Sequence, residues 1–354
     1  MILAGGQGTR LRPLTLARAK PVVPLLNRPV LAYQLALLGQ HGVSDVLLSC
    51  QYRVEDIKTA LGEETLGVRL RYVVEAEPLG TGGGVRNAAD LSAGTVFVLN
   101  GDVLSDVDLS AMRAFHEARG SRTTIFLTRV ADPRQYGLVE LAADGRLRRF
   151  REKPSGDEPI TTDTINAGVY LLDAALLARI PGGRPVSIER EFFPALIADG
   201  TPAFGWVSEA YWRDIGSPAA YRAAHLDLLT GKARMPLAPP GEPRQGCWID
   251  RDATLGPDVE LVPPAVVGAA ASVEDGARIG PLAVVGERCR IGPGARVEGA
   301  VLWEHVEVGA RSRLRECVIG ADVRIGADVD IGPGVVLESG AFIPDHTRLT
   351  VERG

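Results

Sequence analysis

The first segment able to support chemistry is a glycine-rich run near the start of the chain. It reads LAGGQGTRLRPLT over 3–15, and a lysine and a proline follow at 20–21. Glycines directly after a strand let backbone N–H groups approach a polyanion closely, while Arg10 and Lys20 can supply positive charge. The run has neither the GKS or GKT ending of a Walker loop nor the GxGxxG spacing of a dinucleotide loop. It therefore predicts a pyrophosphate-binding loop of another kind.

The elements that must position this loop alternate between strand and helix patterns up to about residue 230. Apolar, β-rich runs at 46–48, 70–74 and 95–99 are interrupted by a helical pattern at 54–61. Such alternation is typical of a mostly parallel sheet covered by helices, so we expect a Rossmann-like α/β domain. Ser110 predicts the start of a helix through Ala118, and Asp144-Gly145 predicts a hairpin added to the sheet.

After this region the apolar residues recur with a period of six. Aliphatic side chains return every six positions from Ile249 to Val297, slip by one residue near Trp303 and again before Ile319, and continue to Leu349. This period matches neither a helix nor an alternating strand, and an aliphatic residue at each return can pack on its counterparts in neighbouring coils. The pattern predicts a left-handed parallel β-helix of hexapeptide repeats.

The two patterns meet at a proline-rich stretch, MPLAPPGEP over 235–243, which can sustain neither a helix nor a central strand. We therefore predict a catalytic domain over 1–232, a linker over 233–247 and a β-helix over 248–354. The chain of 354 residues is 45% hydrophobic, enough for two separate cores. Because the loop follows Met1 so closely, either the first strand is short or the natural start lies upstream.

Composition narrows the possible partners and the compartment. The net charge of -5 and the pI near 5.7 give no overall attraction to nucleic acid or to anionic membranes. The four cysteines form no CxxC pair, which favours buried free thiols in a reducing compartment over disulfides or a zinc site. No apolar run approaches the roughly 20 residues needed to cross a bilayer. We expect a cytoplasmic protein with no nucleic-acid or membrane partner.

The string GGQGTRLRPLT with its downstream KP resembles the signature of the sugar-phosphate nucleotidyltransferase family. The run GTGGG over 80–84, SIEREFFP over 187–194 and the hexapeptide tail are most similar to actinobacterial mannose-1-phosphate guanylyltransferases. The resemblance extends over nearly the whole chain. Its other segments follow in order as EPLGTGG at 77–83, NGD at 100–102, YG at 136–137, EKP at 152–154, INAG at 165–168 and WRDIG at 212–216.

The resemblance implies a reaction between GTP, or another nucleoside triphosphate, and a sugar 1-phosphate. The sugar phosphate joins the α-phosphorus and pyrophosphate leaves, with Mg²⁺ as the cofactor. Because the nucleophile is already a phosphate oxygen, catalysis depends on positioning and charge neutralisation rather than on an enzyme nucleophile. Mannose 1-phosphate or a related sugar or cyclitol phosphate is the implied acceptor.

The resemblance also implies a role for each catalytic residue. Asp102 and Asp214 would be the Mg²⁺ carboxylates, and Asp102 does follow a strand-like run at 96–99, where open α/β sheets bind ligands. Arg10 and Lys20 would screen the leaving pyrophosphate. Lys153 would hold the phosphate of the sugar 1-phosphate.

The implied binding residues form two groups. Glu75 stands at the base-reading position, where thymidylyl and uridylyl relatives often have glutamine. A carboxylate only accepts hydrogen bonds, and guanine presents adjacent N1–H and N2–H donors, so Glu75 favours guanine. The sugar contacts are Gly137, Glu152 and Asn166, beside Lys153. The nucleotide contacts are Leu3, Ala4, Gly5, Gly6, Gly8, Thr9, Arg10, Glu75, Gly80, Thr81 and Asp102.

Other functions fit parts of the sequence. Relatives of this kind include adenylyl-, uridylyl- and thymidylyltransferases of glucose 1-phosphate. Hexapeptide β-helices also form acyltransferases, for which His305 and His346 are the candidate bases in the solenoid. A regulatory paralogue without catalysis would be free to lose some of the predicted catalytic residues. This chain keeps all of them, namely Arg10, Lys20, Asp102, Lys153 and Asp214. Because β-helix coils commonly associate, we also expect a homo-oligomer.

Overall fold

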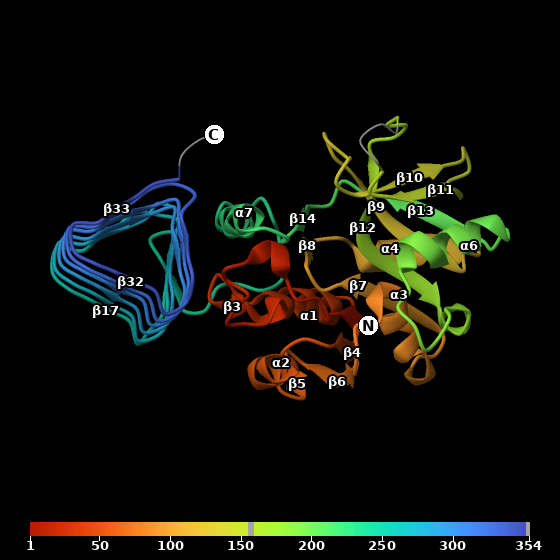
Figure 1. The fold of residues 1–354 in the computed structure, drawn as a ribbon, viewed down its shortest axis with the longest axis horizontal. Coiled ribbons are helices and arrows are strands. Elements are labelled where there is room, and N and C mark those ends of the chain that lie inside the picture. Colours follow the sequence, from red (N-terminus) through yellow and green to blue (C-terminus); the bar gives the residue numbers. More distant parts are fainter. Residues whose placement is uncertain (155–158, 352–354) are drawn as a thin grey trace. The chain divides into compact units, whose positions relative to one another are not determined.

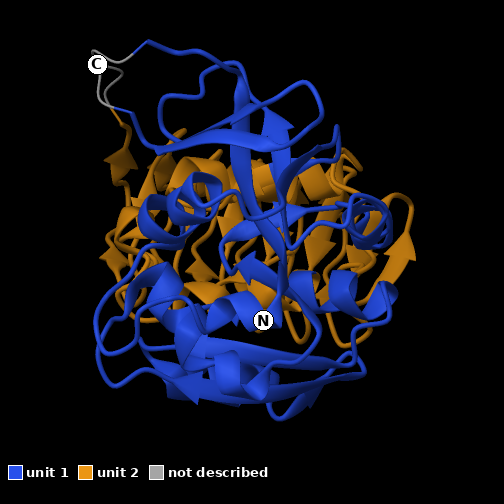
Figure 2. Cartoon of the chain, turned by 90° about the vertical axis from the view of Figure 1, so that its right-hand side faces the viewer, with its two compact units in different colours: residues 1–6, 34–212 blue, residues 7–33, 213–354 orange. Residues whose placement is uncertain are grey.

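The computed structural model describes residues 1–154 and 159–351 (Figure 1). The chain divides into two compact units, coloured separately in Figure 2. The first comprises Met1–Gly6 and Gln34–Trp212, and the second comprises Gln7–Tyr33 and Arg213–Gly354. The division therefore differs from the sequence-based one, because most of the glycine-rich signature and the segment before the linker group with the solenoid.

The first unit is built on a mixed sheet with the order β11-β10-β12-β7-β1-β4-β6-β5, and β9 and β13 continue it beside β12. The central strands β7, β1, β4 and β6 are parallel, whereas β12 runs antiparallel to β7. The bounds are β1 Ile2–Leu3, β4 Asp45–Cys50, β5 Glu64–Thr65, β6 Val68–Val74, β7 Thr95–Asn100, β9 Thr123–Arg129, β10 Gly137–Leu141, β11 Leu147–Glu152, β12 Thr164–Asp173 and β13 Ala203–Val207. Two short strands, β8 Val103–Ser105 and β14 Trp212–Asp214, lie outside this sheet.

Helices follow the strands as the alternating pattern predicted. The predicted strands at 46–48, 70–74 and 95–99 lie within β4, β6 and β7, the predicted helix at 54–61 is α2, and the hairpin at 144–145 joins β10 to β11. The α-helices are α1 Val30–Gln40, α2 Val54–Leu61, α3 Gly80–Asn87, α4 Leu109–Ala118, α5 Ala174–Leu177, α6 Phe193–Ala198 and α7 Pro218–Leu229. Single turns of 3₁₀-helix lie at Thr9–Leu11, Lys20–Val22 and Ala89–Leu91, and a π-helical turn lies at Ile188–Phe192.

The start of α4 corrects one prediction. The helix begins at Leu109 rather than after Ser110, and its cap is Asp108, whose carboxylate accepts a hydrogen bond from the Ala111 N–H at 2.9 Å. Aspartate and serine both cap helices well, and here the aspartate stands two residues earlier, where it can satisfy the free N–H groups of the first turn.

The second unit contains the predicted β-helix, whose coils form three flat faces around an apolar interior (Figure 1). Aliphatic side chains from each sixfold return are buried there in one continuous core. The first face is β15 Glu242–Arg244, β16 Cys247–Ile249, β19 Ala265–Val267, β22 Ala283–Val285, β25 Val301–Leu302, β28 Val318–Ile319 and β31 Val336–Leu337. The second is β17 Thr254–Leu255, β20 Ser272–Val273, β23 Arg290–Ile291, β26 Glu307–Val308, β29 Arg324–Ile325 and β32 Phe342–Ile343. The third is β18 Glu260–Leu261, β21 Arg278–Ile279, β24 Arg296–Glu298, β27 Arg313–Arg315, β30 Asp330–Ile331 and β33 Arg348–Leu349.

The two slips in the sixfold pattern are two shortened coils. Val266 pairs with Val284, but Val284 pairs with Val301 and Val301 with Val318, so each of these later steps is one residue shorter. The longer step returns where Val318 pairs with Val336. The coils stay in register because each deletion removes a residue between strands and leaves the inward-facing aliphatic positions stacked.

The predicted linker contains a strand, which the proline count did not suggest. β15 pairs antiparallel with β16, and Pro243 lies opposite Trp248. The pairing is possible because β15 is the edge strand of its face, where a residue without an N–H is tolerated. The remainder of the second unit includes two short strands, β2 Pro24–Leu25 and β3 Arg28–Pro29, which pair antiparallel.

The cysteines behave as the spacing predicted. All four are free and buried. Burial raises the pKa of the thiols of Cys50, Cys289 and Cys317 to about 12, so they stay protonated and unreactive at neutral pH. Within the described ranges, no helix has both the length and the apolar character to cross a membrane.

Candidate active site

Four parallel strands of the first unit end at one edge of the sheet. Leu3, the last residue of β1, pairs with Ser49 of β4 on one side and with Asn100 of β7 on the other. This is a topological switch point, because the chain leaves β1 toward β4 and returns on the opposite side as β7, and open α/β sheets bind ligands at such points. The predicted site residues that follow these strand ends are Ala4, Gly5, Gly6, Glu75 and Asp102.

Asp102 is carried by a tight turn directly after β7. The Gly101 N–H donates to the Leu3 carbonyl at 2.9 Å, which joins this turn to the end of β1. Asp102 is half-buried. Its carboxylate thus belongs to the same edge as the first residues of the glycine-rich loop.

Glu75 is buried beside that loop and is held by two donors of the chain. The Ser49 hydroxyl donates to one carboxylate oxygen at 2.7 Å, and the Leu79 N–H donates to the other at 3.0 Å. A β-carbon built on Gly5 would lie 3.7 Å from the first oxygen, so the loop backbone passes close to it. Each oxygen retains a second lone pair, and the carboxylate is oriented before any ligand arrives.

The glycines of α3 allow this helix to lie against the Glu75 carboxylate. A β-carbon on Gly84 would come within 2.8 Å of the Glu75 carboxylate and 2.9 Å of the Ser49 hydroxyl. Both contacts are shorter than van der Waals contact, so only glycine fits at this position without moving one of these groups. The GTGGG run is thereby explained by close packing.

Thr81 and Glu189 form a second polar cluster at the start of α3. The Thr81 hydroxyl donates to Glu189 at 2.7 Å and accepts from the Ile188 N–H at 3.0 Å, while Ser187 also donates to Glu189 at 2.8 Å. The Thr81 side chain is therefore engaged within the protein. The sequence predicts no role for Glu189, which stands between Ile188 and Arg190 in SIEREFFP.

The predicted sugar side is formed by the hairpin of β10 and β11. Gly137 pairs with Glu152, and a β-carbon on Gly137 would lie 2.6 Å from the Glu152 carboxylate. Burial, and then the nearby Glu189, raise the pKa of Glu152, while the charge of Lys153 opposes the shift. The Lys153 ammonium lies 3.8 Å from the other Glu152 oxygen. The structure thus brings these three predicted residues together.

Asn166 shapes a bulge in β12. Its amide N–H donates to the Tyr170 hydroxyl at 2.8 Å, and its amide oxygen accepts from the Gly168 N–H at 3.0 Å. The pairing of β12 with β9 shifts register between Asn166 and Tyr170. The INAG motif therefore has a structural task, and the sugar contact of Asn166 stays a prediction.

The basic part of the signature belongs to the second unit, because the division falls between Gly6 and Gln7. Thr15 donates to the Gly8 carbonyl at 2.8 Å, which closes the loop around the turn that carries Arg10. An Arg10 guanidinium nitrogen lies 3.3 Å from the Asp214 carboxylate. Lys20 is buried, with 9% of its surface exposed. The loop therefore holds one enclosed cation and one cation beside a predicted metal ligand.

The donor chemistry of the two predicted metal ligands fits Mg²⁺. Asp102 belongs to the first unit and Asp214 to the second. Among residues 1–154 and 159–351, no three His, Cys, Asp or Glu side chains gather as a metal-binding cluster. Mg²⁺ is usually bound through one or two carboxylates together with substrate phosphates, so a carboxylate of either aspartate has the donor chemistry that suits this ion.

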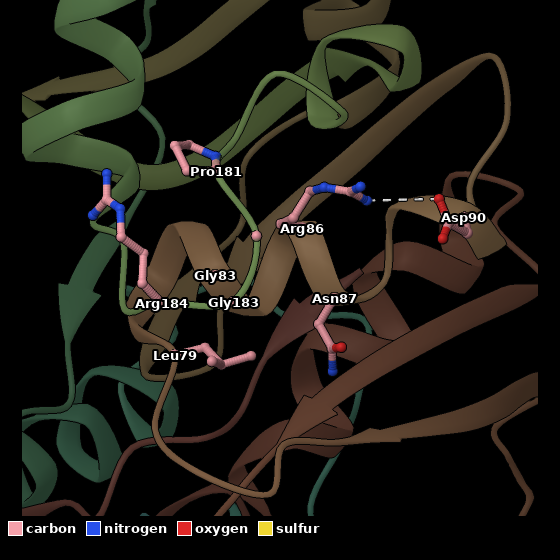
Figure 3. Close-up of a pocket in the computed structure, with 9 residues that line it drawn as sticks. Leu79, Gly83, Arg86, Asn87, Asp90, Pro181, Gly183 and Arg184 are labelled. Carbon is pink, nitrogen blue, oxygen red and sulfur yellow. Dashed lines mark ion pairs between the residues drawn. The ribbon is translucent and has the colours of Figure 1, made fainter.

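A pocket of about 200 Å³ lies along α3, outside the residues predicted from sequence (Figure 3). Arg86 points toward Asp90, with 3.6 Å between their charged groups, and Arg184 lies on the segment at the other side of Arg86. Arg184 is paired in turn with Glu191 at 2.7 Å. The residues that line the pocket are Leu79, Gly83, Arg86, Asn87, Asp90, Pro181, Gly182, Gly183 and Arg184.

The two solenoid histidines lie on turns of the coils. His305 and His346 have φ angles of 58° and 59°, the left-handed conformation typical of such corners. The His305 ring lies 3.1 Å from Asp322 and is partly exposed. Their placement is that of polar turn residues.

Comparison with known proteins decides the family. Residues 1–231 match the family model described as "Nucleotidyl transferase". The chain belongs to the nucleotidyl transferase family. Residues 244–349 match the model described as "EIF2B subunit epsilon LbH domain". The resemblance inferred from the motifs is thereby confirmed, as is the order of an α/β domain followed by a left-handed β-helix.

Curated relatives match nearly the whole chain. The mannose-1-phosphate guanylyltransferase of Mycobacterium tuberculosis is 39% identical over 88% of this chain and 81% of its own length. The probable mannose-1-phosphate guanylyltransferase 2 of Arabidopsis thaliana is 35% identical over 96% of this chain and 95% of its own.

Solved structures match 64% of this nucleotidyl transferase. HddC from Yersinia pseudotuberculosis is 29% identical, covers 64% of this chain and 97% of its own, and has a TM-score of 0.56. The same protein complexed with GMP-PN gives a TM-score of 0.55. A putative glucose-1-phosphate thymidylyltransferase from Bacillus anthracis, at 21% identity and a TM-score of 0.58, shares the fold.

The tight approach of α3 to Glu75 predicts the effect of one methyl group. Gly84→Ala should lower the free energy of unfolding by about 1–3 kcal/mol, the usual cost of overpacking, although alanine favours helix. Urea unfolding measures the change. Gly182→Ala is the matched control, because no atom lies within 4 Å of its added carbon. A Gly84→Ala protein as stable as the wild type would contradict the packing argument.

Proposed function

We propose that this nucleotidyl transferase joins mannose 1-phosphate, or a related sugar or cyclitol 1-phosphate, to GTP and releases pyrophosphate. The observation that carries the proposal is the buried, pre-oriented Glu75 carboxylate at the switch-point edge of the sheet. The names of the relatives from Mycobacterium tuberculosis and Arabidopsis thaliana support the same nucleotide and sugar.

Guanine suits Glu75 for a reason of hydrogen bonding. The carboxylate accepts one hydrogen bond at each oxygen from Ser49 and Leu79, and each oxygen has a second lone pair that can accept another. Guanine offers N1–H and N2–H side by side, whereas adenine offers no such pair. Because the carboxylate is fixed, the ordering cost of binding is already met in the free protein.

The reaction needs one set of residues for the attacking sugar phosphate and another for the leaving pyrophosphate. A phosphate oxygen of the sugar 1-phosphate attacks the α-phosphorus of GTP, and the bond to the β-phosphate breaks as pyrophosphate leaves. Lys153 holds the sugar phosphate, and Arg10 and Lys20 neutralise the charge on the leaving group. Asp102 and Asp214 are the carboxylates for Mg²⁺, which would neutralise further phosphate charge.

A substrate grid tests this function. Purified protein is incubated with Mg²⁺, each of GTP, ATP, UTP and dTTP, and each of mannose, glucose and cyclitol 1-phosphates, and pyrophosphate release is measured. We expect the highest kcat/KM for GTP with mannose 1-phosphate or a close relative of that sugar. A clear preference for ATP or dTTP would contradict the guanylyl assignment and leave nucleotidyl transfer intact.

The metal assignment predicts large losses from small changes. Asp102→Asn and Asp214→Asn should each reduce turnover by orders of magnitude while the protein stays folded, since a neutral amide replaces a charged oxygen ligand. Pyrophosphate release and thermal denaturation are measured together. Asp90→Asn is the control, because that side chain is 94% exposed. Wild-type turnover in either variant would show that its aspartate is not a metal ligand. Full activity in EDTA would show that the reaction needs no metal.

The base assignment predicts a change of preference. Glu75→Gln should weaken GTP use by at most a few kcal/mol in transition-state free energy and narrow its advantage over UTP and dTTP. Ser49→Ala is the matched control, because it removes one internal hydrogen bond from Glu75 and keeps the carboxylate. The control should keep the preference order, measured as kcat/KM for four nucleotides. An unchanged order in Glu75→Gln would show that Glu75 does not read guanine.

A further inference from the structure

The segment that carries the pyrophosphate-binding cations has little regular structure of its own. Between Gln7 and Val30 it forms two single 3₁₀ turns and the two-residue strands β2 and β3. It belongs to the same compact unit as α7 and the β-helix. Its local backbone hydrogen bonds are mostly those of single turns, such as Leu11 N–H to the Gly8 carbonyl at 2.9 Å and Val22 N–H to the Ala19 carbonyl at 3.1 Å. Contacts with α7 and the β-helix add to these bonds in fixing the path of the segment.

The first such contact precedes Lys20 by two residues. Both terminal nitrogens of the Arg18 guanidinium donate to the Glu304 carboxylate, one oxygen each, with the longer bond at 3.2 Å. The same guanidinium lies 5.0 Å from the centre of the Trp303 ring. Both charged side chains are largely enclosed, at 28% and 22% exposure. A two-pronged, partly buried pair stacked on an indole is stronger than an ordinary surface ion pair.

Trp303 marks the first shortened coil of the β-helix. It follows Leu302 at a corner of the coil. The equivalent corner position is Gly286 in the preceding coil and Gly320 in the next one. The Trp303 side chain is 1% exposed. The indole N–H donates to the Tyr221 hydroxyl of α7 at 2.9 Å, and that hydroxyl donates to the Pro24 carbonyl. One coil corner therefore connects to the segment through α7.

Two further contacts hold the segment after Lys20. The Leu26 N–H donates to Nδ1 of His225 at 3.3 Å, and burial lowers the pKa of His225 to about 3, so the ring is neutral and can accept. The Asn27 amide donates to the Val285 carbonyl of the β-helix at 2.9 Å. The buried Lys20 thus stands between attachments on both sides.

We propose that Arg18, Glu304 and Trp303 are positioning residues for pyrophosphate. They fix the segment 7–33 against the shortened coil, so that Lys20 and Arg10 meet the β- and γ-phosphates without first being ordered. The inference rests on the proposed function, which assigns those two cations to the leaving group. Order imposed before binding lowers the entropic cost of binding and of the transition state.

The test uses the full-length protein with Arg18→Met, which keeps the aliphatic stem and removes the charged fork. In the reverse reaction the KM for pyrophosphate should rise about tenfold, the scale of a lost charged hydrogen bond. In the forward reaction the KM for the sugar 1-phosphate should be unchanged. Glu304→Gln should act in the same direction, and the double variant Arg18→Glu with Glu304→Arg should restore much of the pyrophosphate KM.

The matched control is Arg311→Met, which breaks a more exposed two-pronged pair with Asp328 elsewhere on the solenoid. Its KM values should equal those of the wild type. Equal increases in both KM values for Arg18→Met, or no rescue by a folded double variant, would overturn the proposal. Calorimetric titration with inorganic pyrophosphate gives the same comparison without turnover. A wild type that binds pyrophosphate tightly but joins no nucleotide to any sugar phosphate would contradict the proposed function alone.

Discussion

The hydroxyl of Tyr221 connects three parts of the second unit by hydrogen bonds. It is fully buried, and burial raises the pKa of this phenol, so it stays protonated and needs both an acceptor and a donor. The Pro24 carbonyl accepts its hydrogen, and the Trp303 indole donates to its oxygen. Leaving either bond unmade would cost about 1–3 kcal/mol. These two hydrogen bonds therefore favour packing helix α7, the signature segment and one β-helix coil together.

A comparable constraint shapes the first unit at the edge of the sheet. The Glu75 carboxylate is satisfied only while Ser49 and Leu79 remain in place, and α3 fits only because Gly84 has no side chain. These contacts are made before substrate arrives. An enzyme that needs no nucleophile of its own relies on such prior order, because its contribution is to hold two phosphate groups in line.

Features with a local or periodic signal could be predicted from the sequence. The strands, the hairpin, the sixfold solenoid and both slips have such signals. The predicted cap, Ser110, lies two positions after the observed cap, Asp108, because two good capping residues stand close together. β15 was missed because prolines obscure an edge strand.

Contacts between distant residues left no comparable trace. Arg18 and Glu304 are 286 residues apart, and nothing periodic links them. The motif that contains Glu189 predicts no role for it, since its partner Thr81 comes within reach only when α3 packs against the π-helical turn. The sequence marks Trp303 only as an interruption of the sixfold period. Association into a homo-oligomer stays a prediction.

The division of the chain between Gly6 and Gln7 bears on how such proteins can be recombined. The proline-rich stretch looks like the natural crossover point for a chimera, and a cut there separates two family models. In a chimera joined there, however, Arg18 would come from one parent protein and Glu304 from the other. A functional hybrid must inherit the signature segment and the shortened coil from the same parent, so these two stretches form one heritable module despite their separation in sequence.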